Sequence, residues 1–252
     1  MKLNTLRLAF AGFGLSLTAA CSQPIVVAVV EEPVEPVEEV EEVPAEPAEP
    51  AEPEESPWIS LFDGETTTGW TNYGKDTISD GWQVIDGELT MVGGGGDIVT
   101  KDMYGNFELE IEWKIAEAGN SGIFYGVLDG GGAVWHSGPE MQVLDNAKHP
   151  NGTNVLTSAG ACYGLYPTTK DAVNGPGEWN KAGIRYEDGA VTHLMNDEVI
   201  CEYVIGSDDW NKRVANTKFK EMPLFGTAKR GRIALQDHSD RVAYRAIRIR
   251  NL

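Results

Sequence analysis

Two pairs of polar residues lie at strand spacing in different parts of the chain. Glu140 and Gln142 are two residues apart in "GPEMQVLDNAKHP", residues 138–150, and Gln236 and His238 repeat the arrangement in "IALQDHSD". Residues two apart in a strand point to the same face of a sheet. Each pair therefore presents polar groups on one face. Met141 and Val143 point to the opposite face in the first stretch, and Ile233 and Leu235 do so in the second.

A third stretch, "AVTHLMND", brings His193 beside a turn at Asn196. If the three strands share one sheet, a carboxylate, amides and two imidazoles meet on it. That mixture suits the hydroxyl groups of a sugar and a hard or borderline divalent cation. Taken alone, a Glu such as Glu140 on a strand face is more often solvated than catalytic, and a strand histidine such as His193 or His238 is more often a hydrogen-bonded structural residue than a ligand.

Several other kinds of catalytic site have no support in the sequence. The Gly-x-Ser-x-Gly motif of serine hydrolases is absent, and so are the His-Glu-x-x-His and Cys-x-x-Cys zinc motifs. Cys162 lies in the apolar stretch "SAGACYGLY", which favours a packed thiol over a nucleophile. Cys162 and Cys201 could form a disulfide in an exported protein or stay separate, and the sequence leaves this open.

Short alternating runs dominate the chain from residue 58 onward. In "NFELEIEWKI" five apolar residues fall on one face and three Glu and one Lys on the other. Further strands are predicted at 121–127, 139–145, 181–187, 190–197, 198–205, 231–237 and 241–249, the last with a bulge near Arg245. Only residues 207–219 look helical. We predict an all-β fold, an antiparallel β-sandwich or jelly roll with one short helix.

The N-terminal segment resembles an export signal. Lys2 and Arg7 precede an apolar run at 8–20, which is shorter than the about 20 residues of a membrane-spanning helix. Small residues then lead to Cys21, as in a bacterial lipoprotein signal peptide of residues 1–21 whose cysteine is lipidated. Ser22 resembles the sorting pattern for the outer membrane. A plain secretory signal with an unrelated cysteine is the alternative.

Residues 22–57 predict a disordered tether rich in Glu, Pro, Ala and Val. Twelve Glu residues fall between 31 and 57, with no aromatic residue. An acidic protein-binding tail is the alternative interpretation. Without these twelve Glu, Lys2 and Arg7, the net charge of −19 becomes −9 for the domain at 58–252. An acidic domain argues against nucleic acid as a partner and favours a neutral substrate or a bound cation.

Seven stretches between Ser60 and the C-terminus resemble the 3-keto-disaccharide hydrolase family of exported bacterial proteins, in the order found there. They are "SLFDGETTTGW", "GWQVIDGELT", "NSGIFY", "GPEMQVLDNAKHP", "GEWNKAGI", "THLMNDEVI" and "GRIALQDHSDRVAYRAIRI". The resemblance implies a concanavalin-like jelly roll. It also implies cleavage of glycosides already oxidised at C3: a base removes the C2 proton, the C1 group is eliminated, and water adds to the resulting glycal.

The residues that match the polar motifs of this family are Glu140, Gln142, Asp145, His193, Asn196, Gln236 and His238. On this resemblance we expect Glu140 and His238 to contact a divalent metal ion or the reacting carbon, and His193 to be a base or ligand. Gln142 and Gln236 would hold sugar hydroxyls, and Tyr125 and Trp179 are candidate walls for stacking on the sugar.

Two other functions remain as alternatives. The domain could be a non-catalytic carbohydrate-binding module held on a membrane tether. It could also be an ordinary glycosidase with Glu140 and Asp145 as its carboxylate pair. The spacing of five residues weakens the second alternative, because a continued strand would place the two side chains on opposite faces.

Overall fold

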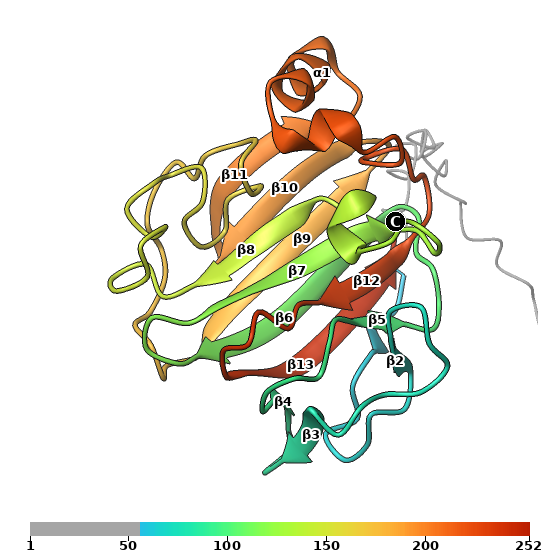
Figure 1. Cartoon of the computed structure of the whole chain (residues 1–252), viewed down its shortest axis with the longest axis vertical. Helices are drawn as coiled ribbons and strands as arrows, with labels where there is room; N and C mark the ends of the chain where they lie inside the picture. The colour runs from blue at the N-terminus through green and yellow to red at the C-terminus, as the bar shows by residue number, and fades with distance from the viewer. Residues whose placement is uncertain (1–55) are drawn as a thin grey trace, which may run out of the picture. The chain divides into compact units, whose positions relative to one another are not determined.

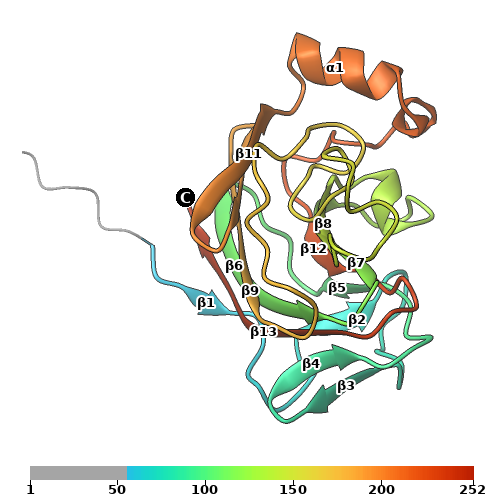
Figure 2. The same cartoon turned by 90° about the vertical axis from the view of Figure 1, so that its left-hand side faces the viewer.

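A computed structural model describes residues 56–252. This part consists of two antiparallel β-sheets, which Figure 2 shows as two facing layers. The predicted all-β sandwich with one short helix is confirmed. The signal peptide with Cys21, and the tether up to residue 55, lie outside the described residues. Within residues 56–252, no helix has the length and apolar character needed to cross a membrane.

The larger sheet has eight strands, and its order in space is visible in Figure 1. In that order the strands are β11 (Glu198–Val204), β10 (Ala190–Met195), β9 (Asn180–Glu187), β6 (Phe107–Ile115), β13 (Val242–Asn251), β4 (Glu88–Met91) and β3 (Trp82–Ile85), with β1 (Ile59–Ser60) paired to β13.

The smaller sheet has five strands and carries the residues of most interest. In spatial order they are β2 (Trp70–Asn72), β5 (Ile98–Thr100), β12 (Arg232–Leu235), β7 (Asn120–Val127) and β8 (Glu140–Leu144). The helical segments are η1 (Val134–His136), α1 (Asp208–Ala215) and η2 (Lys218–Glu221). The η segments are single 3₁₀ turns.

The core lies between the two sheets, and its residues come from the inner faces of the strands. In β6 every second residue from Phe107 to Ile115 is buried, while the residues between them are half-buried on the outer face. Met141 and Val143 of β8 and Ile233 and Leu235 of β12 enter the same core from the smaller sheet. Burial of each such side chain contributes roughly 1.5–3 kcal/mol, so the pattern fixes which face of each strand is inside.

The bulge predicted near Arg245 is confirmed. The register between β13 and β6 shifts between Arg245 and Arg248. Ala246 takes a positive φ of 49° there, which is the local backbone distortion a bulge requires. The extra residue returns Ile247 and Ile249 to the buried face.

The predicted helix at 207–219 is shorter than expected. Ser207 caps α1 by accepting a hydrogen bond from the Trp210 backbone N–H at 3.1 Å. The helix ends at Ala215, and Thr217 takes an extended conformation that starts η2. The side chain of Thr217 accepts from the Phe219 N–H, so this residue caps a new turn rather than continuing the old one.

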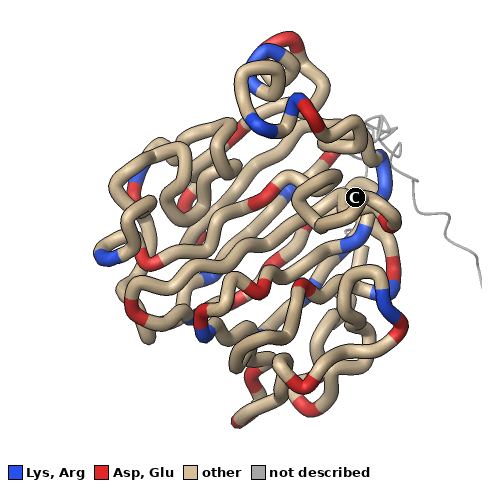
Figure 3. Tube along the Cα trace, in the orientation of Figure 1, with Lys and Arg blue, Asp and Glu red and all other residues tan. Residues whose placement is uncertain are grey.

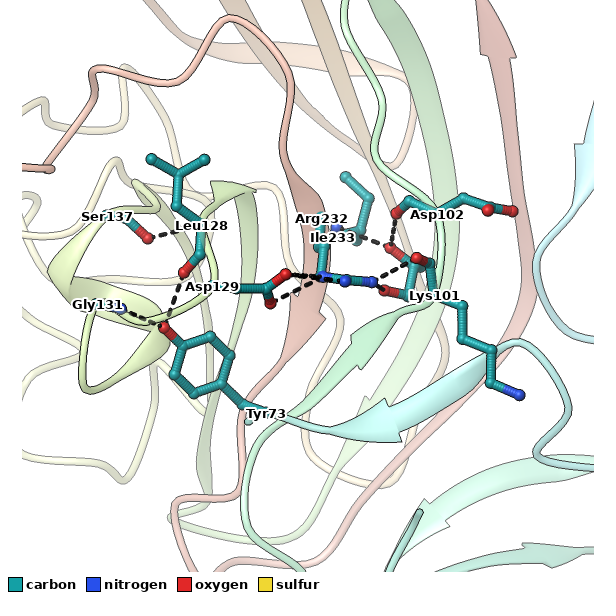
Figure 4. A network of polar contacts seen from close by, with 10 residues as sticks. Tyr73, Lys101, Asp102, Leu128, Asp129, Gly131, Ser137, Arg232 and Ile233 are labelled. Atoms are coloured by element: carbon teal, nitrogen blue, oxygen red, sulfur yellow. Dashed lines mark hydrogen bonds and ion pairs between the residues drawn. The ribbon is translucent and has the colours of Figure 1, made fainter. Parts of the chain in front are cut away.

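A network of polar contacts fixes the loop that follows β7 (Figure 4). The Arg232 guanidinium on β12 donates to both carboxylate oxygens of Asp129 and to the Thr100 carbonyl on β5. The Tyr73 hydroxyl donates to the Leu128 carbonyl at 2.8 Å and accepts from the Gly131 N–H at 3.0 Å. The loop that ends in η1 is therefore held at several points against the smaller sheet.

Candidate active site

The two polar pairs meet on the outer face of the smaller sheet. Gln142 on β8 lies opposite Gly122 on β7. On the other side of β7, the Gln236 N–H donates to the Gly122 carbonyl at 3.0 Å. Met141 and Val143 of β8 and Ile233 and Leu235 of β12 enter the core. By alternation, Glu140, Gln142 and Gln236 point away from it. Three neighbouring strands thus form a polar floor.

Loops and 3₁₀ turns build walls over this floor and enclose a cavity of about 200 Å³. This is several times the volume of about 30 Å³ that one water molecule takes in the liquid. We call it the sheet pocket; its lining residues are Asn120, Trp135, Glu140, Gln142, Tyr163, Lys218, Phe219, Gln236 and His238. Trp135 comes from η1, Lys218 and Phe219 come from η2, and Tyr163 comes from the segment after β8.

Glu140 is the acidic residue of the sheet pocket. Its carboxyl has no hydrogen-bond or ion-pair partner among residues 56–252. Burial raises the pKa of this carboxyl to about 8, the charge of Lys218 opposes the rise, and Asp97 adds to it. A carboxyl group with a pKa near neutrality can exchange a proton with a substrate.

Gly122 makes room for the Glu140 side chain. A Cβ at this position would lie 2.4 Å from Glu140 Oε1 and 3.0 Å from its Cδ, too close for any real contact. The carboxyl group therefore lies directly over the β7 backbone. The Gly in "NSGIFY" is needed here for close approach.

Unpartnered amide groups surround the carboxyl. Gln142 is 1% exposed, and neither its Oε1 nor its Nε2 has a hydrogen-bond partner in the described part of the chain. Asn120 Oδ1 and Gln236 Oε1 are also buried and have no hydrogen-bond partner between residues 56 and 252. Unpaired buried polar groups cost roughly 1–3 kcal/mol each. Several of them converging on one cavity indicate a polar ligand that completes their hydrogen bonds.

His238 reaches the sheet pocket from a loop that is fixed at both ends. The Asp237 carboxylate accepts from the Gly96 N–H at 2.7 Å, and the Asp237 N–H donates to Asp97 Oδ1. Asp240 Oδ2 accepts from the Asn120 N–H at 3.0 Å. The His238 ring has no hydrogen-bond partner within residues 56–252, so both ring nitrogens are available to a ligand.

The donor set for a metal ion is limited. Residues 56–252 contain no cluster of three or more His, Cys, Asp or Glu side chains that could hold a metal. In the sheet pocket, Glu140 and His238 are joined instead by the unpartnered oxygens of Asn120, Gln142 and Gln236. Carboxylate and amide oxygens with one imidazole fit a hard or borderline divalent ion.

His193 does not reach the sheet pocket, and the expectation that its strand shares a sheet with Glu140 is wrong. Its strand, β10, belongs to the larger sheet, and the ring is fully buried between the layers. Nδ1 donates to the Gly160 carbonyl at 2.9 Å, so Nε2 accepts from the hydroxyls of Tyr125 and Tyr203, both at 3.2 Å. Tyr125 is likewise a core residue, 2% exposed, rather than a wall of the pocket.

We predict that His193 makes the fold sensitive to acid. Burial lowers its pKa to about 4 from the ordinary value of 6.5. Between these pH values the unfolded chain binds more protons than the folded one, so the free energy of unfolding falls as pH falls from 6.5 toward 4. Urea denaturation across this window should show a smaller pH slope for His193→Gln than for the wild type. Equal slopes would contradict the assignment.

Asp145 and Asn196, two further candidate site residues, use their side chains for hydrogen bonds within turns. The Asp145 carboxylate accepts from the N–H groups of Ala118 and Ala147 at 2.8 and 3.0 Å. Asn196, at a positive φ of 50°, uses its side chain to bond Lys181, Ala172 and Asn180. Neither side chain lines the sheet pocket, and both hold the ends of strands in place.

Trp179 lies on the opposite side of the molecule from the sheet pocket. Its ring contacts the Lys114 ammonium, 4.4 Å from the ring centroid, and the Arg245 guanidinium at 4.0 Å. These residues belong to the outer face of the larger sheet, where Glu residues of β6 pair with Arg residues of β13. Figure 3 shows acidic and basic residues interspersed over the described part of the chain. Among the described residues, Cys162 and Cys201 are both buried and do not form a disulfide.

Five lining residues were not predicted from the sequence: Asn120, Trp135, Tyr163, Lys218 and Phe219. Asn120 is two residues before Gly122, so the alternation rule used for Glu140 and Gln142 could have found it. The other four come from turns and loops, whose side chains carry no periodic signal.

The chain is similar to known proteins over most of its length. The family model for the 3-keto-alpha-glucoside-1,2-lyase-like domain matches residues 57–250. A 3-keto-disaccharide hydrolase of Bacteroides thetaiotaomicron is 35% identical over 227 residues, which cover 77% of this chain and 78% of that protein.

Solved structures show the same relationship. A crystal structure of a candidate glycosyl hydrolase from Parabacteroides distasonis has a TM-score of 0.73 at 34% identity, covering 77% of this chain and 94% of that one. A second from the same organism has a TM-score of 0.61 at 29% identity, covering 82% and 95%. On the extent of the family match and of these similarities, the chain belongs to the 3-keto-alpha-glucoside-1,2-lyase-like domain family.

Proposed function

We propose that this protein is a carbohydrate-active enzyme that cleaves the glycosidic bond of 3-keto-glycosides in the sheet pocket. The observation that carries the proposal is the unpaired Glu140 carboxyl, set among unpartnered amides and aromatic side chains in one cavity. Amides suit sugar hydroxyls, and the rings of Trp135 and Tyr163 offer apolar faces to a sugar. The similar proteins named above support a substrate of this class.

The reaction begins with Glu140 as the base. A ketone at C3 acidifies the hydrogen on C2, and the ionised carboxylate removes that proton. The electron pair of the C2–H bond moves toward the C3 oxygen and then expels the oxygen substituent at C1, which leaves with a proton. Addition of water to the resulting 2-hydroxy-glucal gives the free 3-keto sugar. A base with a pKa near the working pH serves this step best.

The neighbouring residues bind and orient the sugar. Gln142, Gln236 and Asn120 complete their hydrogen bonds with ring hydroxyls, which fixes C2 against the carboxyl. His238 is placed to exchange a proton with the leaving oxygen or with the incoming water. A divalent ion held by Glu140, His238 and the amide oxygens would polarise the ketone. In that case Glu140 would share its carboxylate between the ion and the proton.

A turnover assay tests the proposal. The purified full-length protein is incubated with 3-keto-trehalose and an aryl 3-keto-glucoside, with the unoxidised sugars, and with each after chelator treatment. We expect release of the C1 group from oxidised sugars alone, with a transient glycal.

Binding without turnover of any sugar would instead identify a carbohydrate-binding module. Cleavage of unoxidised glycosides would identify an ordinary glycosidase. Loss of activity on chelation, restored by a divalent metal, would support the ion.

We also propose that the enzyme is exported and held at the bacterial envelope through a lipid on Cys21, with residues 22–57 as the tether. The sequence pattern before Cys21 supports this. In the native host, Cys21→Ala should move the protein from the membrane fraction to the soluble fraction and abolish incorporation of labelled fatty acid. An unchanged membrane fraction for this variant would contradict the anchor.

A further inference from the structure

Lys218 is the cationic side chain of the sheet pocket. Within residues 56–252 its Nζ makes no hydrogen bond or ion pair. It lies instead 5.0 Å from the ring centroid of Trp135, 5.1 Å from that of Tyr163 and 5.4 Å from that of Phe219. Two of the lysines outside the pocket, Lys114 and Lys181, are paired with carboxylates.

Packing sets the position of this ammonium. Phe219, the next residue, stacks on Phe225 at 4.2 Å between centroids, and Phe225 stacks on the buried Trp210 of α1. The Gly226 N–H donates to the Ser137 carbonyl at 2.8 Å, which ties the segment after η2 to the segment after η1. The chain on both sides of the pocket rim is therefore anchored, and Lys218 is directed over the aromatic rings that line it.

The charge of Lys218 acts on Glu140. Both residues line the same cavity, and Lys218 is the cation that opposes the rise in the pKa of the Glu140 carboxyl. Charges interact more strongly in a partly desolvated pocket than in water. Cation–π contacts hold the ammonium without neutralising it, so its full charge stays available to a ligand.

We propose that Lys218 is a catalytic residue whose ammonium stabilises the negative charge that proton abstraction moves from Glu140 to the C3 oxygen of the substrate. This inference rests on the proposed function. Before the step the negative charge is on Glu140; after it Glu140 is neutral and the charge is on the enolate oxygen. When that oxygen's electron pair expels the C1 group, the charge leaves with the departing oxygen, which takes up a proton. A fixed cation in the cavity favours this intermediate without needing to reorganise.

Three variants test the role. Lys218→Met keeps the aliphatic stem and removes the charge, Lys218→Arg keeps the charge, and Lys220→Met is the matched control on the same 3₁₀ turn outside the pocket. For Lys218→Met we expect kcat to fall about 100-fold and the acid limb of the kcat–pH profile to move to higher pH. Lys218→Arg should have the acid limb at the wild-type pH and should keep much of the wild-type kcat. Lys220→Met should match the wild type in both.

Other outcomes would overturn the inference. A rise in KM for Lys218→Met at unchanged kcat and unchanged acid limb would reduce Lys218 to a binding residue. A wild-type protein without activity on any 3-keto-glycoside would remove the proposed function and the catalytic role together. In that case, NMR titration of the Glu140 side-chain carboxyl carbon still tests the electrostatic coupling between Lys218 and Glu140. An upward shift of its midpoint in Lys218→Met supports the coupling, and an unchanged midpoint excludes it.

Discussion

Replacing Glu140 by Gln should reduce kcat on a 3-keto-glycoside by about 10³-fold, because the variant keeps the shape of the side chain and loses the base. Among residues 56–252, no other acidic side chain lines the sheet pocket. Asp97 acts on Glu140 through its charge but is not a lining residue. Steady-state and single-turnover rates with an aryl 3-keto-glucoside measure the effect on the chemical step directly.

The fold should survive this substitution, and stability provides the control. The pKa of Glu140 is raised from 4.5 to about 8 in the folded protein. Its contribution to stability is therefore complete below pH 4.5 and lost as pH rises through 8. Glu140→Gln cannot ionise, so it should unfold at higher temperature than the wild type near pH 9. Glu117→Gln, a change in an exposed ion pair with Lys148, should leave rate and stability near wild type. Near-full activity of Glu140→Gln would show that the base is elsewhere.

The same group sets the pH dependence of the wild type. The proton acceptor is the ionised carboxylate, so kcat/KM should rise about tenfold per pH unit below 8 and level off above it. Spontaneous elimination of 3-keto sugars at high pH is subtracted with an enzyme-free blank. A profile that is flat from pH 6 to 9 would be inconsistent with Glu140 as the base.

The position of Asp145 argues against the ordinary glycosidase. Retaining and inverting enzymes both need two carboxyl groups flanking one bond, at roughly 5–5.5 Å or 6.5–9.5 Å. The Asp145 carboxylate is bonded to two backbone N–H groups and does not line the sheet pocket. One carboxyl with a raised pKa, surrounded by amides, suits proton abstraction beside a ketone better than double displacement at C1.

Strand alternation predicted the polar floor and could not predict which sheet each strand joins. A two-residue period places Glu140 with Gln142 and away from the core, and β8 follows this rule. His193 obeys the same period, but β10 pairs in the larger sheet, where its ring faces the core. Sheet membership depends on long-range pairing, and nothing local in "AVTHLMND" encodes it. Burial lowers the pKa of His193, and the hydrogen bond to the Gly160 carbonyl opposes this change. Two of the groups bonded to the ring, Gly160 and Tyr125, are distant in sequence.

The walls of the sheet pocket were not predictable for a different reason. Trp135 and Lys218 come from 3₁₀ turns whose place over the sheet is decided by the Asp129–Arg232 network and by the aromatic stack under α1. The sequence pattern predicts a single helix at residues 207–219. The break at Asn216 and Thr217, which brings Lys218 and Phe219 over the cavity, is seen only in the structure.

Gly122→Ala should lower kcat by about 10²-fold without disturbing the sandwich. Its Cβ would lie 2.4 Å from Glu140 Oε1, and the flexible end of that side chain is the group able to move. Displacement of a catalytic group by about 1 Å costs on the order of 10² in rate. The backbone at 122 does not have a positive φ, so alanine is allowed there and β7 keeps its pairing with β8 and β12.

Gly175→Ala is the matched control, since a Cβ there meets no atom within 4 Å and the backbone again lacks a positive φ. It should match the wild type in rate and melting temperature. Gly122→Ala should keep its melting temperature as well, so that the loss appears in kcat alone. Equal kcat values for the two variants would mean that the carboxyl does not act from its place over β7. In that case Gly122 would be retained only for the close approach of Glu140 to the strand. The comparison therefore separates a glycine needed for packing from one needed to place the base.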